Sequence, residues 1–343
     1  MALRALLRFA GVAAALLCAA AAPAKNEFVP VFTENFPDAV VIRHGAQFIA
    51  YSTNDGPNVP IATSTDLVHW GFAMDPARPG KRRDALPRLG VWAKPGFTWA
   101  PEVIELGGRY LLYYTASDVK RNAQCVGVAV ASDPLGPFVD SSPNPIVCQT
   151  ELGGTIDADA FRDADGKLYL YFKNDGNRVG KHSGIWGQQL AADGLSVTGQ
   201  AVELIRDDKA WEQKLVEAPT MVRSPLGYEL FFSAAYFGWN EDQKLSPYGM
   251  GYASCAGPLG PCKKSGDNPI LHSFYDRQSG CLSGPGHQSI FEVGNRSFIS
   301  FHAWQASSGC RKVDDRRYLF IAPIFWRDGK PQLGPSLRAT GAN

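Results

Sequence analysis

The feature that most constrains the fold is a segment that recurs five times along the chain. Each copy begins with a polar or acidic residue beside Pro, Gly or Ala and continues into a short apolar run. A turn with Gly or Asn follows, and then a second apolar run that is rich in aromatic residues. Two such runs around a turn of this kind are typical of a β-hairpin. The five predicted hairpins occupy residues 36–53, 98–116, 156–174, 216–234 and 284–304.

A further apolar segment follows each hairpin, so that the repeat period is roughly 60 to 70 residues. These third strands are predicted within residues 59–70, 125–138, 184–197, 249–262 and 318–326. No long stretch has the apolar periodicity of a helix. Three to four strands in each of five repeats predict an all-β fold, a single five-bladed β-propeller whose innermost strands line a central channel. The alternative is a β-sandwich with irregular strands, which the regular recurrence disfavours.

Acidic residues occur where the first strand of a repeat begins, in four of the five repeats. A hairpin with a purely structural role does not need an acid at this point, whereas two carboxyl groups at one mouth are what cleavage of a glycosidic bond requires. One carboxyl group donates a proton to the leaving oxygen, and the other activates water or attacks directly. A third acid can hold the donor in place and raise its pKa. The residues at these starts are Asp38, Glu102, Asp157 or Asp159, Glu217 and, in the fifth repeat, His287.

The first residues have the pattern of an export signal. Arg4 and Arg8 precede an apolar run over residues 9–22, which ends in the small-residue pattern Ala22-Pro23-Ala24. These parts predict a signal peptide over residues 1–24 and a propeller domain over residues 25–343. A membrane anchor is the alternative, but the run is short for a spanning helix. We therefore expect a secreted protein, extracellular or periplasmic, that has no membrane contact after cleavage and is a monomer.

Charge excludes some partners of the mature chain. The full sequence has 34 basic and 33 acidic residues, and cleavage would remove two arginines and no acid. A nearly neutral protein has no electrostatic reason to bind nucleic acid or an anionic membrane. Neutral polymers such as polysaccharides remain possible partners.

Six of the seven cysteines lie after the signal segment, and an even number in an exported chain indicates disulfides. Sequence proximity favours the pairs Cys125–Cys148, Cys255–Cys262 and Cys281–Cys310, although six cysteines allow fifteen pairings. A zinc site is disfavoured, because the tight pairs of cysteines that such sites use do not occur.

Motifs in all five repeats resemble those of glycoside hydrolase family 43, and the resemblance covers nearly the whole mature chain. The motifs are Pro37-Asp38, Trp99-Ala100-Pro101-Glu102, Ile156-Asp157-Ala158 with the turn Asp163–Lys167, Glu217-Ala218-Pro219, and Gly284-Pro285-Gly286-His287 followed by His302-Ala303-Trp304. The chain departs from the family at Ala158, where Pro is usual, and at Ala218, where Gly is usual.

The resemblance implies a role for each acid in an inverting hydrolase. Asp38 would be the general base, Glu217 the general acid, and Asp157 the residue that orients Glu217 and tunes its pKa. Inversion implies that Asp38 and Glu217 lie about 6.5–9.5 Å apart. Strand alternation places Asp157 and Asp159 on the same face, so Asp159 stays open as the orienting acid. Glu102 is expected to be a channel acid or a hydrogen-bonding residue between blades.

Four further residues are predicted to bind substrate: Trp99, Phe36, Arg317 and His287. Trp99 would stack on the sugar, with packing between blades as the alternative, and Arg317 resembles a sugar-contacting arginine, with a surface charge as the alternative. No cofactor is expected to be required. A calcium ion in the channel, held through water at His287, is a possibility that the resemblance raises, since calcium prefers oxygen ligands.

The resemblance favours arabinose- or xylose-containing plant polysaccharides or oligosaccharides as substrates, with an α-L-arabinofuranosidase or endo-arabinanase ahead of a β-xylosidase. The chain ends shortly after the last predicted strand, so we expect no appended module, which also tilts the prediction toward arabinan. A non-catalytic carbohydrate-binding propeller is the alternative from another class, disfavoured because it needs no acid pair. A fructan-active propeller is disfavoured because its Arg-Asp-Pro and Glu-Cys motifs do not occur.

Overall fold

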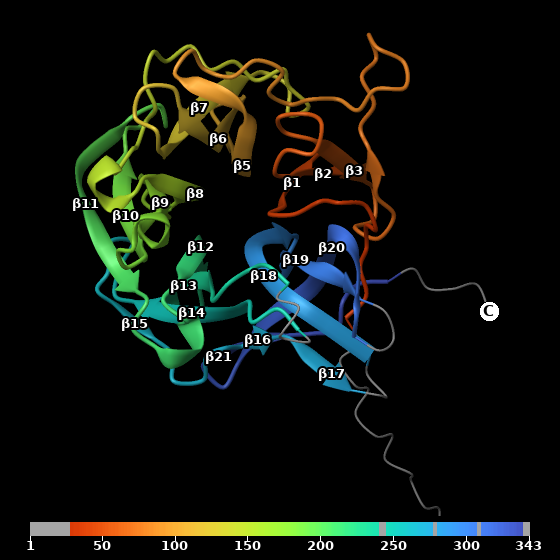
Figure 1. The fold of residues 1–343 in the computed structure, drawn as a ribbon, viewed down its shortest axis with the longest axis vertical. Helices are drawn as coiled ribbons and strands as arrows, with labels where there is room; N and C mark the ends of the chain where they lie inside the picture. The colour runs from red at the N-terminus through yellow and green to blue at the C-terminus, as the bar shows by residue number, and fades with distance from the viewer. Residues whose placement is uncertain (1–27, 240–244, 277–279, 307–309, 339–343) are drawn as a thin grey trace, which may run out of the picture.

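The computed structural model describes residues 28–239, 245–276, 280–306 and 310–338. These residues form five antiparallel sheets that stand around a common axis like the blades of a propeller (Figure 1). The predicted all-β fold with five blades is therefore confirmed. In the described ranges the helical segments are three short 3-10 turns, Thr150–Leu152, Gly176–Val179 and Ala210–Glu212. The predicted signal peptide, residues 1–24, lies outside the described residues.

None of the helices in the described part of the chain is long and apolar enough to cross a membrane.

The sheets follow one another along the chain, one for each repeat. Blade I contains β1 (Val40–His44), β2 (Gln47–Tyr51), β3 (Ile61–Ser64) and β4 (Gly71–Phe72). Blade II contains β5 (Ala93–Leu106), β6 (Arg109–Asp118) and β7 (Gln124–Ala131). Blade III contains β8 (Thr155–Arg162), β9 (Leu168–Asn174), β10 (Gly184–Leu190) and β11 (Val197–Arg206).

The last two sheets are larger. Blade IV contains β12 (Val216–Ser224), β13 (Gly227–Ala234), β14 (Gly249–Cys255), β15 (Cys262–Lys264) and the short β16 (Leu271–His272), which pairs with β14. Blade V contains β17 (Phe274–Asp276), β18 (Gly280–Val293), β19 (Arg296–Ala306), β20 (Lys312–Arg327) and β21 (Lys330–Leu333).

The five predicted hairpins are the inner two strands of the blades. β1, β5, β8, β12 and β18 lie nearest the axis, and each contacts the next around the ring, with β18 returning to β1 (Figure 1). The turns contain glycines with positive φ, for example Gly45 at 60° and Gly294 at 64°. Glycine adopts this backbone conformation without steric cost, which explains why the turn residues were visible in the sequence.

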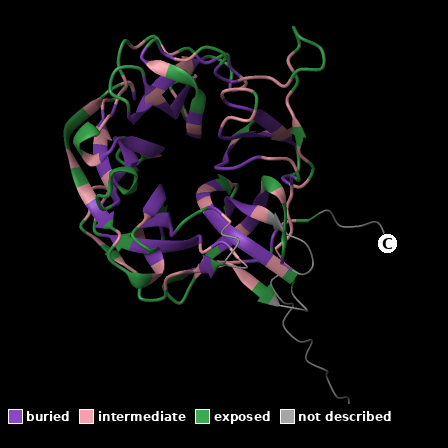
Figure 2. Cartoon of the chain, viewed as in Figure 1, coloured by how far each residue is buried: buried purple, intermediate pink, exposed green. Residues whose placement is uncertain are grey.

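The core is divided among the junctions between blades. Five clusters of buried apolar side chains lie in the described residues, one between each pair of neighbouring blades. Both faces of the inner strands are covered by neighbouring blades, whereas the outer edges of the sheets reach solvent (Figure 2). This arrangement leaves the axis as the place where polar side chains from all five blades can meet.

The first residues of the described chain close the ring against the last blade. The backbone N–H of Val31 donates to the carbonyl of Leu319 in β20 at 2.9 Å, and that of Phe36 donates to the carbonyl of Arg317 at 2.9 Å. The segment before β1 therefore lies beside β20 of blade V. The start of blade I, including Asp38, is held by residues from the far end of the sequence.

Three disulfides lie in the described residues: Cys125–Cys148, Cys255–Cys262 and Cys281–Cys310. All three are the pairs that sequence proximity favoured, so this prediction is confirmed. Cys255–Cys262 links β14 to β15 within blade IV. Cys281–Cys310 links β18 to the segment just before β20 within blade V.

Candidate active site

Each blade contributes one residue with a left-handed backbone at the same place, where the innermost strand reaches the mouth of the channel. A positive φ is uncommon for a residue other than glycine, and it costs of order 1–3 kcal/mol. In blades II to V the pairing of the hairpin shifts at this place, which marks a β-bulge. The five residues are Asp38 (φ 58°), Ala100 (44°), Asp157 (56°), Ala218 (52°) and His287 (52°).

The backbone N–H groups of these five residues are bound by side chains of the preceding blade. In four blades the acceptor comes from the end of the second hairpin strand or just after it: Thr53 for Ala100 (2.9 Å), Thr115 for Asp157 (3.2 Å), Ser233 for His287 (2.8 Å) and His302 for Asp38 (3.2 Å). The fifth differs, because Ala218 donates to Asp157 Oδ2 at 3.1 Å. A repeated hydrogen bond thus holds the strained bends that line the mouth.

Below the mouth the axis is closely filled. A cavity of about 20 Å³ lies there, lined by three consecutive residues from each blade: 38–40, 100–102, 157–159, 218–220 and 287–289. This volume is enough for about one water molecule. Asp157 and Asp159 both line it, as strand alternation predicted, and Glu102 lines it as a channel acid.

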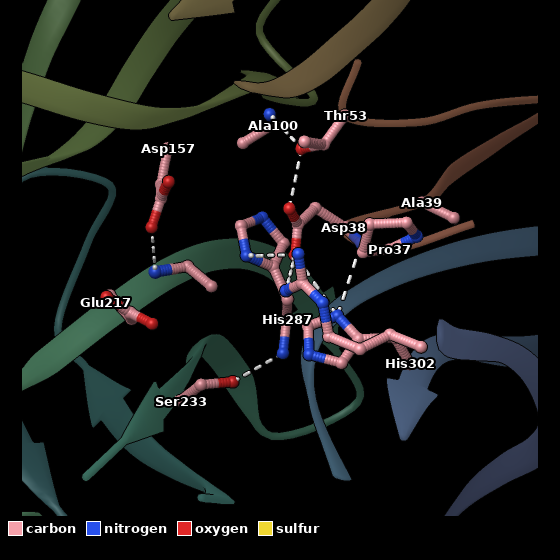
Figure 3. Close-up of polar contacts among 12 residues, drawn as sticks. Pro37, Asp38, Ala39, Thr53, Ala100, Asp157, Glu217, Ser233, His287 and His302 are labelled. Atoms are coloured by element: carbon pink, nitrogen blue, oxygen red, sulfur yellow. Dashed lines mark hydrogen bonds and ion pairs between the residues drawn. The ribbon is translucent and has the colours of Figure 1, made fainter. Parts of the chain in front are cut away.

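Asp38 is surrounded by hydrogen-bond donors and basic side chains (Figure 3). Its Oδ2 accepts a hydrogen bond from the Thr53 hydroxyl at 2.5 Å, and its Oδ1 accepts one from Arg317 at 3.1 Å. His287 Nδ1 lies 3.3 Å from the same Oδ1. Burial acts to raise the pKa of Asp38, but Arg317 and His287 outweigh it and hold the pKa well below its usual value. Asp38 is therefore a carboxylate at neutral pH.

His302 contacts both the backbone and the carboxylate of Asp38. Its side chain is fully buried, and its ring stacks on that of Tyr248 with centroids 5.8 Å apart. Burial and the charge of Arg317 lower the pKa of His302 to about 4, so the ring is neutral at neutral pH. Its Nδ1 lies 3.2 Å from the backbone nitrogen of Asp38 and 3.1 Å from Asp38 Oδ1.

Glu217 lies on the other side of the channel mouth, in a buried network of hydrogen bonds. Its Oε2 accepts a hydrogen bond from Lys173 at 3.1 Å, and its Oε1 accepts one from the Tyr248 hydroxyl at 2.8 Å. Lys173 is almost completely buried and also lies 3.7 Å from Asp175. Neither Lys173 nor Tyr248 was singled out from the sequence. A single charged residue inside the otherwise uncharged strand β9 (Leu168–Asn174) was the available signal for Lys173.

Asp157 lies beside the backbone that carries Glu217. Its Oδ2 accepts the N–H of Ala218, the residue directly after Glu217 (Figure 3). Burial raises the pKa of Asp157 to about 6, helped by the negative charges of Glu217 and Asp38 and opposed by His287 and Lys173.

Asp159 lies two residues further along the channel and has different neighbours. Its Oδ2 accepts the N–H of Met221 at 3.1 Å, and burial raises its pKa to about 7. Burial and the nearby charge of Asp159 raise the pKa of Glu102 well above its usual value. The described hydrogen bonds connect Asp157, and not Asp159, to the residue that follows Glu217.

The glycine before His287 makes room for Tyr248. A Cβ atom at Gly286 would lie 2.1 Å from the Tyr248 ring, far inside contact distance. The close approach of the β18 backbone lets the Tyr248 hydroxyl reach Glu217. This contact explains the second glycine of the Gly-Pro-Gly-His motif.

Arg317 belongs to the site and not to the outer surface. Besides its ion pair with Asp38, its guanidinium carbon lies 5.2 Å from the ring centroid of Phe237 and 5.9 Å from that of Trp304. Phe237 and its neighbour Tyr236 are exposed, which leaves aromatic surface beside the carboxylates. These two aromatic residues lie just after β13 of blade IV, beyond Ala235, and were not predicted.

Trp99 lies at the mouth of blade II. It is half-buried, and its ring meets that of the exposed Phe97 edge to face, with centroids 6.2 Å apart. Phe36 is a correction: its side chain is fully buried between blades V and I and packs against Phe32 and Phe72. The prediction that Phe36 binds substrate is therefore wrong, because its ring belongs to the core that closes the propeller.

The described residues do not supply a ready set of metal ligands. They contain no group of three or more His, Cys, Asp or Glu side chains arranged to hold a metal ion. His287 directs Nδ1 at Asp38, as its 3.3 Å distance indicates. Protein side chains thus do not form a calcium shell here, and a calcium ion held through water remains a prediction.

A larger cavity lies elsewhere, away from the channel mouth. It has a volume of about 900 Å³ and is lined by the hairpin-turn residues of blades IV and V, including Ser224 and Asn295. These turns are at the opposite ends of β12 and β18 from Glu217 and His287. Chemistry, and not cavity size, therefore distinguishes the candidate site.

Comparisons with known proteins agree with this geometry. The sequence profile described as "Glycosyl hydrolases family 43" matches residues 29–331. A β-D-galactofuranosidase (xynD) of Aspergillus niger is 28% identical over 267 residues, which cover 73% of this chain and 68% of the relative. An extracellular exo-α-(1→5)-L-arabinofuranosidase (ArbA) of Cellvibrio japonicus is 24% identical, covering 94% of this chain and 91% of the relative. The crystal structure of a thermostable family-43 glycoside hydrolase superposes with a TM-score of 0.74 at 25% identity, over 92% of this chain and 98% of that one.

Proposed function

Because the chain belongs to glycosyl hydrolase family 43, whose members are inverting O-glycosyl hydrolases, we propose that it cleaves arabinose- or xylose-containing glycosides with Asp38, Glu217 and Asp157. The observation that carries the proposal is the contrast between the two sides of the channel mouth. One side holds an ionised carboxylate, and the other holds carboxyl groups that share a buried network.

Asp38 is proposed as the general base. A base must be ionised before the reaction, and Arg317 and His287 hold the pKa of Asp38 well below its usual value. Its carboxylate would take a proton from water as the water attacks the anomeric carbon. The Thr53 hydroxyl and the Arg317 guanidinium fix the direction of the two carboxylate oxygens.

Glu217 is proposed as the general acid, and Asp157 as the residue that orients it. Glu217 would give its proton to the glycosidic oxygen as the bond to the anomeric carbon breaks. Asp157 holds the N–H of Ala218 and so fixes the backbone that carries Glu217. The separation of about 6.5–9.5 Å between base and acid that an inverting enzyme needs stays a prediction.

The sugar is proposed to be a furanoside, with α-L-arabinofuranosides first. The two relatives described above are named as a β-D-galactofuranosidase and an exo-α-(1→5)-L-arabinofuranosidase. Trp99, Phe237 and Tyr236 offer aromatic faces on which sugar C–H groups can pack. Arg317, between Phe237 and Asp38, is placed to bind a hydroxyl group of the sugar next to the bond that breaks.

We propose that residues 1–24 are removed on export and that residues 25–343 act as one catalytic domain, as a monomer outside the cytoplasm. Three disulfides and the word "extracellular" in the name of the Cellvibrio japonicus relative support secretion. No cofactor is proposed for the reaction, and dialysis against a chelator tests the water-held calcium ion at His287.

The decisive experiment is an assay of the mature protein on aryl α-L-arabinofuranoside, β-D-galactofuranoside and β-D-xyloside and on linear arabinan, with product anomers followed by NMR. We expect the arabinofuranoside or arabinan to be cleaved, with inversion. Release of xylose alone would favour a β-xylosidase. No release from any substrate would contradict the substrate proposal, and a product of retained configuration would contradict the role of Asp38.

A further inference from the structure

The five-fold hydrogen-bond pattern has one exception, and it lies beside the proposed acid. The hairpin register pairs Trp99 with Thr115, Glu217 with Ser233 and Gly286 with His302, and in blade III it pairs Ile156 with Lys173. Lys173 therefore occupies the position that elsewhere holds Thr, Ser or His. An ammonium group has no acceptor, so Lys173 cannot bind the N–H of the next blade.

Two contacts follow from this exception. The N–H of Ala218 is bound by Asp157 Oδ2 at 3.1 Å, and Lys173 is free to direct its ammonium at Glu217 Oε2, 3.1 Å away. The Lys173 side chain is only 1% exposed. A lysine is almost never buried to this extent unless it is paired, and its partners here are Glu217 and Asp175.

We propose that Lys173 is a positioning residue for Glu217, which fixes one carboxylate oxygen and stabilises the negative charge that Glu217 acquires when it gives up its proton. This inference rests on the proposed role of Glu217 as the acid. In that step the O–H bond of Glu217 breaks and its proton moves to the leaving oxygen, which keeps the electron pair of the broken glycosidic bond. The resulting carboxylate is bound by Lys173 and Tyr248.

Among the groups around Glu217, Lys173 is the charged side chain that donates a hydrogen bond to it directly. Asp157 and Asp175 are the other carboxyl groups of the network, Tyr248 is its neutral donor, and Asp38 and His287 act on Asp157 from across the channel. Burial acts to lower the pKa of Lys173, but the carboxylates of Glu217, Asp157 and Asp175 outweigh it and raise the pKa, so Lys173 stays charged. An opposite charge at hydrogen-bond distance favours the ionised carboxylate.

The kinetic test uses two variants and a matched control. Lys173→Met removes the ammonium and keeps the bulk, and Lys173→Thr installs the residue type that other blades use at this position. Lys264→Met is the control, because Lys264 is another nearly buried lysine, 6% exposed, which pairs with Glu212 at 2.6 Å in the outer part of blade IV. All three variants lose a buried ion pair, but only the first two touch Glu217.

For Lys173→Met and Lys173→Thr we expect the alkaline limb of the kcat/KM profile to move up by about one pH unit or more. We also expect kcat to fall about tenfold on substrates with poor leaving groups, and less on an aryl glycoside with a good leaving group, which needs little help from an acid. Lys264→Met should keep the wild-type profile even where its melting temperature falls. An alkaline limb that stays in place in both folded Lys173 variants would overturn the proposal.

A second measurement does not depend on activity. Glutamate labelled with ¹³C at the carboxyl carbon is followed by NMR during a pH titration, with the Glu217 signal identified by its absence in Glu217→Gln. The Glu217 transition should lie at higher pH in Lys173→Met than in wild type, and an unchanged transition would overturn the inference. If the wild type cleaves none of the glycosides, the proposed function fails, while this titration still decides the role of Lys173.

Discussion

The two sides of the channel mouth hold similar groups in opposite settings. On the blade I side, one carboxylate, Asp38, faces Arg317, His287 and the Thr53 hydroxyl. On the blade III and IV side, three carboxyl groups, Asp157, Asp175 and Glu217, share a single buried ammonium. The first side has more positive than negative charge around its acid, and the second has the reverse.

This difference separates the proton affinities of groups that are chemically alike. The pKa of Asp38 is held well below its usual value, chiefly by Arg317 and His287 against the effect of burial, whereas burial raises that of Asp157 to about 6. The lowered pKa belongs to Asp38, the proposed base, and the raised pKa to Asp157, the residue proposed to orient the acid, so the two sides differ in how readily they hold a proton. Substitutions on one side of the mouth at a time test this difference.

The largest effect is expected from Asp38→Asn. Asparagine keeps the shape and can still accept the hydrogen bond from Thr53, but it cannot take a proton from water. We expect kcat/KM to fall by about 10²–10⁴-fold, with the melting temperature measured in parallel to establish that the variant is folded. A folded Asp38→Asn protein with more than about a tenth of wild-type activity would contradict the role of Asp38 as base.

A smaller effect should distinguish Asp157 from Asp159, which the sequence left open. Asp157→Asn disturbs the group that holds the backbone next to Glu217, and we expect a loss of about 10²-fold in kcat. Asp159→Asn is the matched control two residues along the same strand, and kcat should stay within a few-fold of wild type because Asp159 binds Met221 instead. A larger loss in Asp159→Asn than in Asp157→Asn would reverse the assignment.

Arg317→Met should shift the pH dependence on the acidic side. Arg317 lowers the pKa of Asp38, so without it the base becomes ionised only at higher pH. The acidic limb of kcat/KM is expected to move up by about one unit or more, in the same direction as the alkaline limb in the Lys173 variants but on the opposite side of the profile. If the acidic limb keeps its wild-type position, another group must control the ionisation of Asp38.

Asp159→Asn, below the channel mouth, should have the smallest effect on activity but a measurable effect on stability. Burial raises the pKa of Asp159 to about 7, while an unfolded chain has an Asp pKa of about 3.9. Between these pH values the folded state holds a proton on Asp159 that the unfolded state has lost. The contribution of Asp159 to the free energy of unfolding therefore decreases as pH rises from about 4 to 7, by up to about 1.4 kcal/mol per unit. Asp159→Asn should remove this decrease. Calorimetric melting of both proteins from pH 4 to 8 is the measurement, and parallel curves would refute the prediction.

The fold could be predicted because each blade repeats its own local signals. Gly45 and Gly294 mark turns at equivalent places, and the apolar runs around them pair as the sequence indicated. The disulfides joined cysteines that were near in sequence, so they too were accessible to prediction. Repetition supplied five independent observations of one pattern.

The site was less predictable because it depends on departures from regular strand geometry and on contacts between blades. Strand alternation placed Asp157 and Asp159 on one face, but it could not show that the positive φ of Asp157 directs its carboxylate to the backbone next to Glu217. Phe36 was misjudged because its neighbour Asp38 faces the channel while Phe36 itself turns into the core. Lys173 was missed because only the hairpin register reveals that it breaks a five-fold pattern.

The closure of the ring determines when the environment of Asp38 can form during synthesis of the chain. Asp38 lies near the start of the mature chain, yet His287, His302 and Arg317, which hold its backbone and its charge, all come from the last blade. A ribosome makes Asp38 more than 200 residues before these partners. The proposed base therefore acquires its charged environment only when the two ends of the polypeptide meet, so that a chain without the last blade lacks it even if the other four blades are folded.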